Sequence, residues 1–433
     1  MSEQALPRIL IQNGRVIDPS QSLDEVTNVL IEDGHIAAYD VSPNGQDVIR
    51  DASHKIVSPG LIDIHVELRE PGWEEDETIA SGTRAALAGG FTSVACIPNT
   101  NPPVDTQASV EFIRHQAALA DNCRVFVLAC VSKNRQGKEL SEIGSLVDAG
   151  AVGFSDADSP IYNAELLRRA FEYCRMFNKP ILNHPEVLEL THEGTMHEGL
   201  VSMVLGLGGL PTEAEDMMTG RDLRMAEATD GRLHIMNVSS AESVELIRRA
   251  KSRQLSVSAE VCPHHLFLTD EKLRSFDTNY KVNPPLRDQR SVDACIAGLV
   301  DGTLDVIASG HAPRASEKKM QELDRAPFGM IGLETALGIV NQQLIQPGHL
   351  DWPAVLAKMT VNPARVLELE QGTLQVGKEA DVTVIDPAVR WTVSKSSLLS
   401  KSSNTPLLGT ELHGRADTVI VGGRVKYSLN ETR

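Results

Sequence analysis

Residues 59–72 read Pro59-Gly60-Leu61-Ile62-Asp63-Ile64-His65-Val66-Glu67-Leu68-Arg69-Glu70-Pro71-Gly72, and this stretch decides the fold. Its apolar run predicts a buried β-strand, and the Glu-Pro-Gly at its end predicts a turn. Residues two apart in a strand project to the same side, so His65 and Glu67 would present an imidazole and a carboxylate together. Zinc accepts both groups as ligands. The segment therefore predicts a strand that delivers metal-binding or catalytic side chains.

The middle of the chain repeats this pattern, because short apolar runs alternate there with amphipathic stretches such as Ala164–Phe177 and Ala241–Lys251. Eight strands that alternate with helices predict an α/β fold, a (β/α)8 TIM barrel, in which the chemistry sits at the C-terminal ends of the strands. The candidate strands are Leu61–Val66, Phe91–Pro98, Arg124–Val131, Ala151–Asp156, Pro180–His184, Arg232–Val238, Leu255–Cys262 and Leu304–Ser309.

Both ends of the chain carry a different pattern, in which short apolar runs are separated by turn dipeptides such as Asn13-Gly14 and Asp33-Gly34. This pattern is typical of β-hairpins, and it returns from Gly372 onward. We expect a small β-sandwich domain built from residues 1–58 and 366–433, beside a barrel of residues 59–365. The Ser/Lys-rich segment Ser394–Ser403 is expected to be a surface loop.

The composition excludes several classes of protein. The chain has 433 residues, a formal net charge of -18 and 41% hydrophobic residues, which suits a large barrel plus an accessory domain. The acidic balance argues against binding to nucleic acid or to anionic membranes. No apolar run is long enough to span a membrane, and from Met1–Gln4 we expect no signal peptide. The six cysteines form no C-x-x-C pair, so we expect reduced, buried thiols in a cytoplasmic protein.

Polar residues fall at or just beyond the ends of the predicted strands, where a barrel places its chemistry. Among them, His65, Glu67, Asp156 and His184 offer two imidazoles and two carboxylates, a suitable ligand set for Zn²⁺. Spacing alone leaves the metal site open, because a single histidine is more often a core or surface residue than a ligand. The strand-end residues are His65, Asn99, Asp156, His184, Asn237 and His311, with Asn283 further out in a long loop.

A series of ordered motifs carries a resemblance to a known family. They are Glu70-Pro71-Gly72, Ala88-Gly89-Gly90-Phe91-Thr92, Pro98-Asn99-Thr100, Phe154-Ser155-Asp156, His197-Glu198-Gly199, Glu260-Val261-Cys262-Pro263-His264-His265, Asn283-Pro284-Pro285-Leu286-Arg287, His311-Ala312-Pro313 and Ala326-Pro327-Phe328-Gly329. The chain resembles the dihydroorotases of the amidohydrolase superfamily. Allantoinases and hydantoinases usually lack the Asn-Pro-Pro-Leu-Arg and Ala-Pro-Phe-Gly motifs, and they generally use a carbamylated lysine where this chain has Asp156. The resemblance is therefore to the aspartate-bridged (class I) branch.

The resemblance implies a hydrolase of de novo pyrimidine (UMP) biosynthesis that interconverts N-carbamoyl-L-aspartate and L-dihydroorotate. It implies two zinc ions that share a hydroxide, with His65, His184 and the bridging Asp156 as ligands. Arg69, Asn99 and Asn283 would hold the substrate. The resemblance also implies a homodimer and a structural role for His264 and His265.

The chain departs from the family pattern at positions that matter for catalysis. The second histidine of the first strand is Glu67, a histidine ligand is replaced by Asn237, and the catalytic aspartate is replaced by Gly310. Glutamate can bind zinc, an asparagine is a poor replacement for imidazole, and glycine offers no side chain. No catalytic residue is therefore certain. Arg314 stands where a substrate-holding histidine is expected, and a guanidinium there could also neutralise Glu67 or Asp156.

Two hypotheses follow. The three replaced positions favour a pseudoenzyme, a non-catalytic scaffold or partner of aspartate carbamoyltransferase, with no zinc in the chain. The retained Arg69, Asn99 and Asn283 favour the alternative, an active dihydroorotase or related cyclic amidohydrolase with an atypical, single-zinc site.

Overall fold

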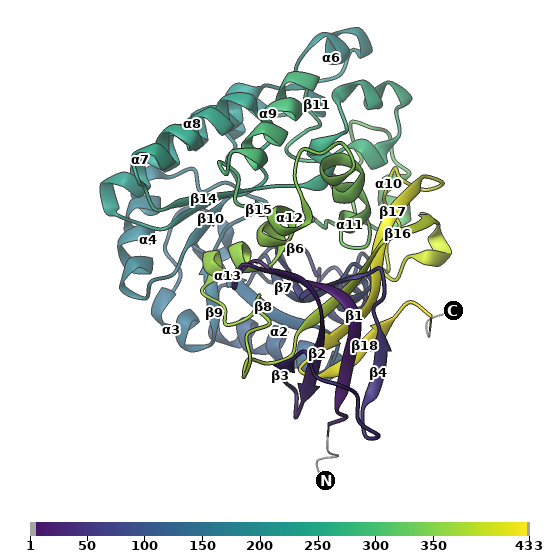
Figure 1. Cartoon of the computed structure of the whole chain (residues 1–433). Helices are drawn as coiled ribbons and strands as arrows, with labels where there is room; N and C mark the ends of the chain where they lie inside the picture. Colours follow the sequence, from purple (N-terminus) through teal and green to yellow (C-terminus); the bar gives the residue numbers. More distant parts are fainter. Residues whose placement is uncertain (1–5, 431–433) are drawn as a thin grey trace.

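The computed structural model describes residues 6–430, and its centre is a barrel of eight parallel strands (Figure 1). Hydrogen bonds join the strands in the order β15-β14-β13-β10-β9-β8-β7-β6, so strands that follow one another in the sequence lie side by side. The strands are β6 (Leu61–Val66), β7 (Phe91–Cys96), β8 (Arg124–Ala129), β9 (Ala151–Phe154), β10 (Ile181–Asn183), β13 (Leu233–Ile235), β14 (Val257–Val261) and β15 (Val306–Ile307).

The two ends of this strand order meet at the end of β6, within residues 59–72. A parallel bridge joins Val66 to His311, and the backbone N–H of Glu67 donates to the carbonyl oxygen of His311 at 2.9 Å. These contacts nearly close the barrel, and the predicted (β/α)8 fold is confirmed. They also place the end of β6 directly beside the segment that follows β15.

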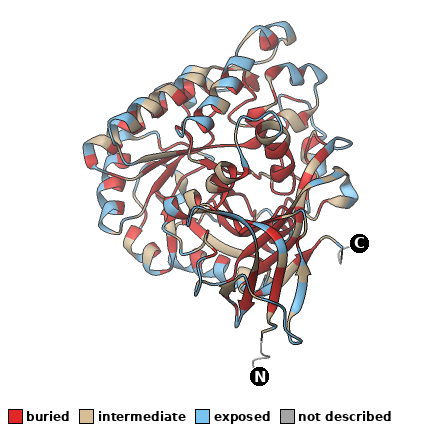
Figure 2. Cartoon of the chain, viewed as in Figure 1, coloured by how far each residue is buried: buried red, intermediate tan, exposed pale blue. Residues whose placement is uncertain are grey.

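Helices form the outer layer of the barrel, and the longer ones bury one face and expose the other (Figure 2). In α4, Leu167 and Phe171 are buried, whereas Arg168 and Glu172 form an exposed ion pair on the opposite face. The helices are α1 (Ile79–Ala88), α2 (Gln107–Ala120), α3 (Ile143–Asp148), α4 (Ala164–Met176), α5 (Leu188–Thr191), α6 (Leu200–Leu205), α7 (Thr212–Thr229), α8 (Ala241–Ser252), α9 (Gln289–Val300), α10 (Ser316–Lys319), α11 (Ala336–Val340), α12 (Trp352–Met359) and α13 (Val361–Leu367).

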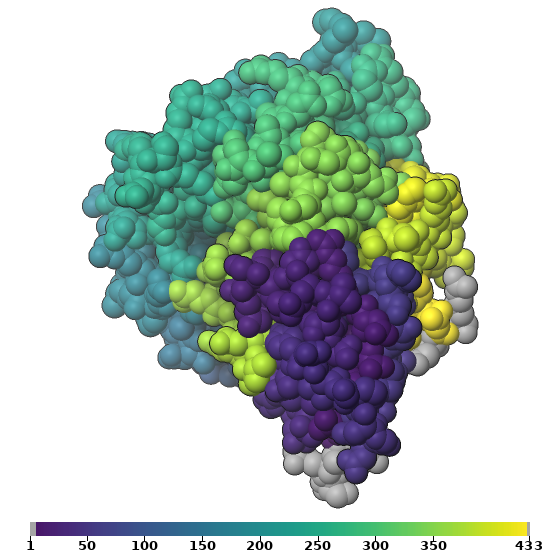
Figure 3. All heavy atoms as spheres, viewed as in Figure 1, coloured from purple at the N-terminus to yellow at the C-terminus, as the bar shows by residue number. Residues whose placement is uncertain are grey.

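The two ends of the chain meet in one hydrogen-bonded sheet beside the barrel, as Figure 3 shows by the contact between the purple and yellow surfaces. Its order is β18-β17-β16-β5-β1-β2-β3, with β4 also paired to β1. The predicted joining of both chain ends is confirmed. The domain boundaries after residues 58 and 365 stay predictions, and residues 1–5 and 431–433 lie outside the described residues. The strands are β1 (Ile9–Asp18), β2 (Leu23–Glu32), β3 (His35–Tyr39), β4 (Val48–Asp51), β5 (Ile56–Pro59), β16 (Val382–Thr392), β17 (Glu411–Val421) and β18 (Arg424–Ser428).

The segment between β16 and β17 differs from the exposed loop that its Ser/Lys-rich sequence predicts. Ser402 is buried, and its hydroxyl donates to the carbonyl oxygen of Asp76 at 2.5 Å. The backbone N–H of Leu399 donates to the Glu334 carboxylate at 2.7 Å. The segment thus packs against the barrel loops that follow β6 and β15, and hydroxyl groups serve there as buried hydrogen-bond donors.

Smaller elements complete the chain over the C-terminal end of the barrel. A two-stranded sheet of β11 (Met196–His197) and β12 (Gly209–Leu210) lies in the long connection between β10 and α7. The 3-10 helix η2 (Pro263–Leu266) follows β14. Among residues 6–430, no helix is both long and apolar enough to cross a membrane.

We predict that Gly60→Ala destabilises the fold by about 1–3 kcal/mol, because the added methyl group would overpack the junction between barrel and sheet. A Cβ atom at Gly60 would lie 2.0 Å from the Oγ1 atom of the buried Thr92. The exposed Gly45 has nothing within 4 Å of such an atom, so Gly45→Ala should change stability by less than about 0.5 kcal/mol. Urea unfolding of the two variants measures the difference, and equal midpoints would contradict the tight contact.

Candidate active site

A cavity of about 600 Å³ opens at the C-terminal end of the barrel, where the sequence places the chemistry. Side chains from several strand ends and loops converge on it. The residues of the predicted site that line the cavity are His65, Glu67, His184, Asn237, Asn283, Gly310 and Arg314. The charged groups on its wall that sequence reasoning did not single out are Asp158 and Glu186. The roles of the predicted residues stay predictions.

His65 is held by a buried carboxylate behind it. Its Nδ1 atom lies 2.5 Å from Oε1 of Glu260, whose other oxygen lies 3.1 Å from Nε2 of His234. Burial lowers the pKa of His65, but the nearby Glu260 outweighs it and the pKa is raised overall. Burial raises the pKa of Glu260, and the two imidazoles reverse this and bring it to about 2. A carboxylate behind an imidazole is the usual support of a metal-binding histidine, and it leaves Nε2 of His65 for a ligand.

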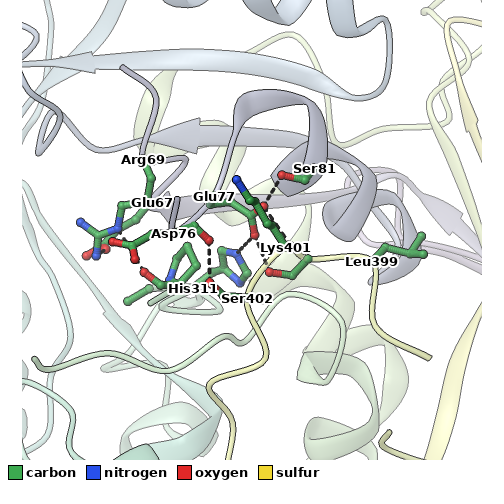
Figure 4. Close-up of polar contacts among 12 residues, drawn as sticks. Glu67, Arg69, Asp76, Glu77, Ser81, His311, Leu399, Lys401 and Ser402 are labelled. Atoms are coloured by element: carbon green, nitrogen blue, oxygen red, sulfur yellow. Dashed lines mark hydrogen bonds and ion pairs between the residues drawn. The ribbon is translucent and has the colours of Figure 1, made fainter. Parts of the chain in front are cut away.

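Glu67 is engaged by cationic groups of the chain itself (Figure 4). Its Oε2 atom forms an ion pair with Nη2 of Arg69 and lies 4.0 Å from Nη1 of Arg314. Glu67 and Arg69 are buried, and burial together with the neighbouring Arg314 lowers the pKa of Arg69 to about 9. Arg314 also lies 3.9 Å from Oδ2 of Asp76. The predicted approach of Arg314 to Glu67 is therefore present, but the closer partner of Glu67 is Arg69.

Asp156, the predicted bridging ligand, has both carboxylate oxygens engaged by the neighbouring loop. Oδ1 accepts hydrogen bonds from the backbone N–H groups of Val131 and Ser132 at 2.9 and 3.1 Å, and Oδ2 accepts one from the Ser132 hydroxyl at 2.5 Å. Asp158, two residues later, lines the cavity instead and forms an ion pair with Arg135. The one sequence feature that could have identified Asp158 was its position two residues after Asp156, as a second carboxylate in the same turn.

A second carboxylate–imidazole pair lies across the cavity. Oε2 of Glu186 lies 3.3 Å from Nε2 of His184 and accepts a hydrogen bond from Nδ2 of Asn283 at 2.9 Å. Burial raises the pKa of Glu186, but these partners, His184 first, lower it to about 2. Sequence reasoning found no carboxylate to replace the missing aspartate. His184 and Glu186 have the same spacing as His65 and Glu67. This repeated His-x-Glu pattern was the sequence feature that could have identified Glu186.

The position of the family's catalytic aspartate is closed to side chains. Gly310 has a φ of +60°, and a Cβ atom there would lie 2.5 Å from Sγ of Cys262. The Cys262 thiol in turn donates to Oδ1 of Asn237 at 2.9 Å. Two of the replaced positions thus lie against one buried thiol, and no carboxylate fits at residue 310 without movement of Cys262.

Asn99, predicted to hold substrate, is buried with neither side-chain amide atom hydrogen-bonded. Buried amides nearly always have partners, because an unpaired polar group costs about 1–3 kcal/mol. Such an unpaired amide is expected where a ligand supplies the missing hydrogen bonds.

These observations test whether the residues fit the two metals that the resemblance implies, and they do not. Glu67 is paired with Arg69, Asp156 is fully hydrogen-bonded, and Gly310 supplies nothing. Within residues 6–430, no three of the predicted ligands bring donor atoms within 4.8 Å of one another.

Comparison with known proteins places the chain in a family. Residues 54–243 match the family described as Dihydro-orotase-like, and residues 330–427 match the Amidohydrolase family. A dihydroorotase from Pelotomaculum thermopropionicum is 49% identical over 420 residues, covering 96% of this chain and 98% of that protein. The chain belongs to the dihydroorotase family. A dihydroorotase from Geobacter metallireducens is 47% identical over 97% of this chain and 99% of that protein.

Solved structures agree on the fold. The L-hydantoinase (dihydropyrimidinase) from Arthrobacter aurescens superposes with a TM-score of 0.86 at 24% identity, covering 96% of this chain and 95% of that one. At this identity the likeness shows the fold alone. The predictions of family and fold are confirmed, whereas the zinc ligands and the loss of catalysis stay predictions.

We predict that Glu260→Gln destabilises the metal-free protein by about 3–5 kcal/mol at mildly acidic pH, because it breaks a buried charged pair. The pKa of Glu260 is lowered from 4.5, so its contribution is present above about pH 4.5 and is lost as pH falls toward about 2. The pKa of His65 is raised from 6.5, so its contribution is present below about pH 6.5 and is lost at higher pH. Urea unfolding against pH should therefore show the largest difference between about pH 4.5 and 6.5, and a pH-independent difference would contradict the charged pair.

Proposed function

We propose that this chain interconverts N-carbamoyl-L-aspartate and L-dihydroorotate in the cavity at the barrel mouth, as a step of pyrimidine biosynthesis. Support comes from relatives named dihydroorotase, which are 45–49% identical over nearly the full chain. These relatives favour the active alternative, an enzyme with an atypical site, over the non-catalytic scaffold.

The observation that carries the proposal is a surviving set of groups suited to a substrate carboxylate. Arg69 pairs with Glu67, whereas Nη1 of Arg314 lies 4.0 Å from Glu67 and 3.9 Å from Asp76, beyond hydrogen-bond distance. Arg314 lines the cavity, so this Nη1 atom can still bind a ligand carboxylate. Guanidinium binds carboxylates with two parallel hydrogen bonds. Asn99 adds a buried amide without a protein partner. Both proposed substrates carry carboxylates, and a cavity of about 600 Å³ accommodates molecules of this size.

The protein groups can also move a proton at the reacting amide. In ring opening, water adds to the ring carbonyl, the C–N bond breaks and the released nitrogen takes up a proton; ring closure reverses these steps and releases water. An Oε atom of Glu186 accepts the proton from the attacking water, while His184 and Asn283 hold this carboxylate in place. A base with a pKa of about 2 is weak at neutral pH, so this route is slow.

The proposal includes fewer zinc ions than the two that the resemblance implies. The chain does not fit the family's metal pair, so no step above passes through a metal. The charged groups of the cavity wall suit at most one zinc ion. Nε2 of His65 would bind it, while Glu260 supports the imidazole through Nδ1. Cytoplasmic location and homodimer formation remain part of the proposal as family-based predictions.

A second candidate is a non-catalytic member of the family, and one observation favours it. The missing proton shuttle at Gly310 and the occupied Glu67 remove two groups of the family reaction, and loss of the shuttle alone costs about 10²–10⁴ in rate. Nothing in the comparisons supports a role as scaffold for aspartate carbamoyltransferase, and that partner stays a prediction.

The two candidates are separated by a direct assay. The chain is purified from cells that lack the host dihydroorotase and is incubated with each substrate, with and without added zinc. The proposal predicts slow conversion in both directions and genetic rescue of the host's pyrimidine requirement. Asn99→Ala should raise KM by roughly tenfold with an unchanged urea midpoint, because its amide holds no protein partner. Product formation no greater than in a mock purification, without rescue, would establish the non-catalytic candidate.

We predict that Glu186→Gln lowers kcat by about 10²–10⁴ with little change in KM, because it removes the proton acceptor but keeps the shape. The matched control is Glu189→Gln, which changes an exposed carboxylate three residues away and should leave both constants unchanged. Steady-state kinetics of ring opening give the comparison. Equal kcat values for the two variants would remove Glu186 from the mechanism.

A further inference from the structure

A buried thiol and two imidazoles gather beside the cavity, which His264 lines, at a place to which the family pattern assigns no metal. Cys262 directly follows β14, and His264 and His265 come next in the 3-10 helix η2. The Sγ atom and one ring nitrogen of each imidazole lie within 4.8 Å of one another. The three side chains are buried. Within residues 6–430, this is the one group of three or more such ligands that lies so close together.

The hydrogen bonding of His265 leaves one nitrogen ready for a ligand. Its Nε2 atom lies 3.1 Å from the carbonyl oxygen of Pro284, which can only accept, so Nε2 carries the proton. Nδ1 then holds a free lone pair, and this atom is buried without a hydrogen-bond partner. Histidines that bind metals characteristically donate their other N–H to a backbone carbonyl in this way. A histidine that serves only packing would leave this buried acceptor unsatisfied at a cost.

The surroundings provide access and a neutral fourth donor. Asn237, His264 and Gly310 line the cavity, so an ion can reach the cluster from solvent. Oδ1 of Asn237 lies 2.9 Å from Sγ of Cys262. Gly310 packs closely against that sulfur, because a Cβ atom at residue 310 would lie 2.5 Å from it. The thiol itself is buried, and the two residues in contact with its sulfur, Asn237 and Gly310, line the cavity.

We propose that Cys262, His264 and Nδ1 of His265 bind one zinc ion in the wall of the cavity, with Asn237 or water as the fourth ligand. Thiolate and imidazole ligands favour zinc over the hard cations, and three protein ligands with one open position are a common zinc arrangement. The thiol releases its proton to solvent as the Zn–S bond forms. This site does not use the predicted ligands of the family's metal pair, and it does not depend on catalysis.

Cobalt binding tests the site without any activity measurement. Chelator-treated protein is titrated with Co²⁺, and the thiolate-to-cobalt charge-transfer absorption is recorded. The proposal predicts one Co²⁺ per chain with this absorption, competed away by Zn²⁺. Cys262→Ser should abolish the absorption and weaken binding by more than about tenfold. Cys295→Ser, which changes another buried thiol, and His65→Asn, which changes a predicted ligand of the family pair, should retain it.

A second measurement protects the test against a variant that does not fold. X-ray absorption of the zinc-loaded, unmodified chain should show one sulfur at about 2.3 Å and nitrogen or oxygen neighbours at about 2.0 Å. Zinc without a sulfur neighbour, cobalt absorption that survives in Cys262→Ser, or failure of the unmodified chain to bind either metal would each overturn the proposal.

Discussion

The buried ion pair between Glu67 and Arg69 is the interaction on which the site depends. It lies where the end of β6 meets the segment after β15, so the barrel closure and the site share the same few residues. A buried carboxylate without a partner is strongly unfavourable, and removal of one partner typically costs about 3–5 kcal/mol. The resemblance implies a metal-binding histidine at this position, and here the guanidinium of Arg69 supplies the positive charge instead.

This exchange of charge accounts for the other departures. Once Arg69 and Arg314 neutralise Glu67, the site no longer needs a dication there, and Gly310 and Asn237 can take the places of a carboxylate and an imidazole. Both positions contact the buried thiol of Cys262, and a side chain at residue 310 would clash with its sulfur. The cavity keeps cationic groups and amides suited to an anionic substrate, and the zinc site that we propose does not use the predicted ligands of the family's metal pair.

Much of the fold and part of the site could be predicted from the sequence, and the limits have physical causes. The alternation of strands and helices identified the barrel, strand ends identified His65 and His184, and the family motif identified Gly310, because period, position and motif are local properties. The direction of Asp156 could not be predicted, since it is set by Ser132, a residue that lies 24 positions earlier in the chain. The buried role of Ser402 depends likewise on Asp76, 326 positions away. Such long-range hydrogen bonds leave no periodic signal.

Anomalous diffraction at the zinc edge, from crystals of the chain grown with zinc and N-carbamoyl-L-aspartate, tests the central claim most directly. We expect no pair of zinc peaks between His65 and His184, with Glu67 still paired to Arg69 and the substrate carboxylate near the guanidinium groups. Two zinc ions bridged by Asp156, with Glu67 turned away from Arg69 to bind one of them, would contradict the account.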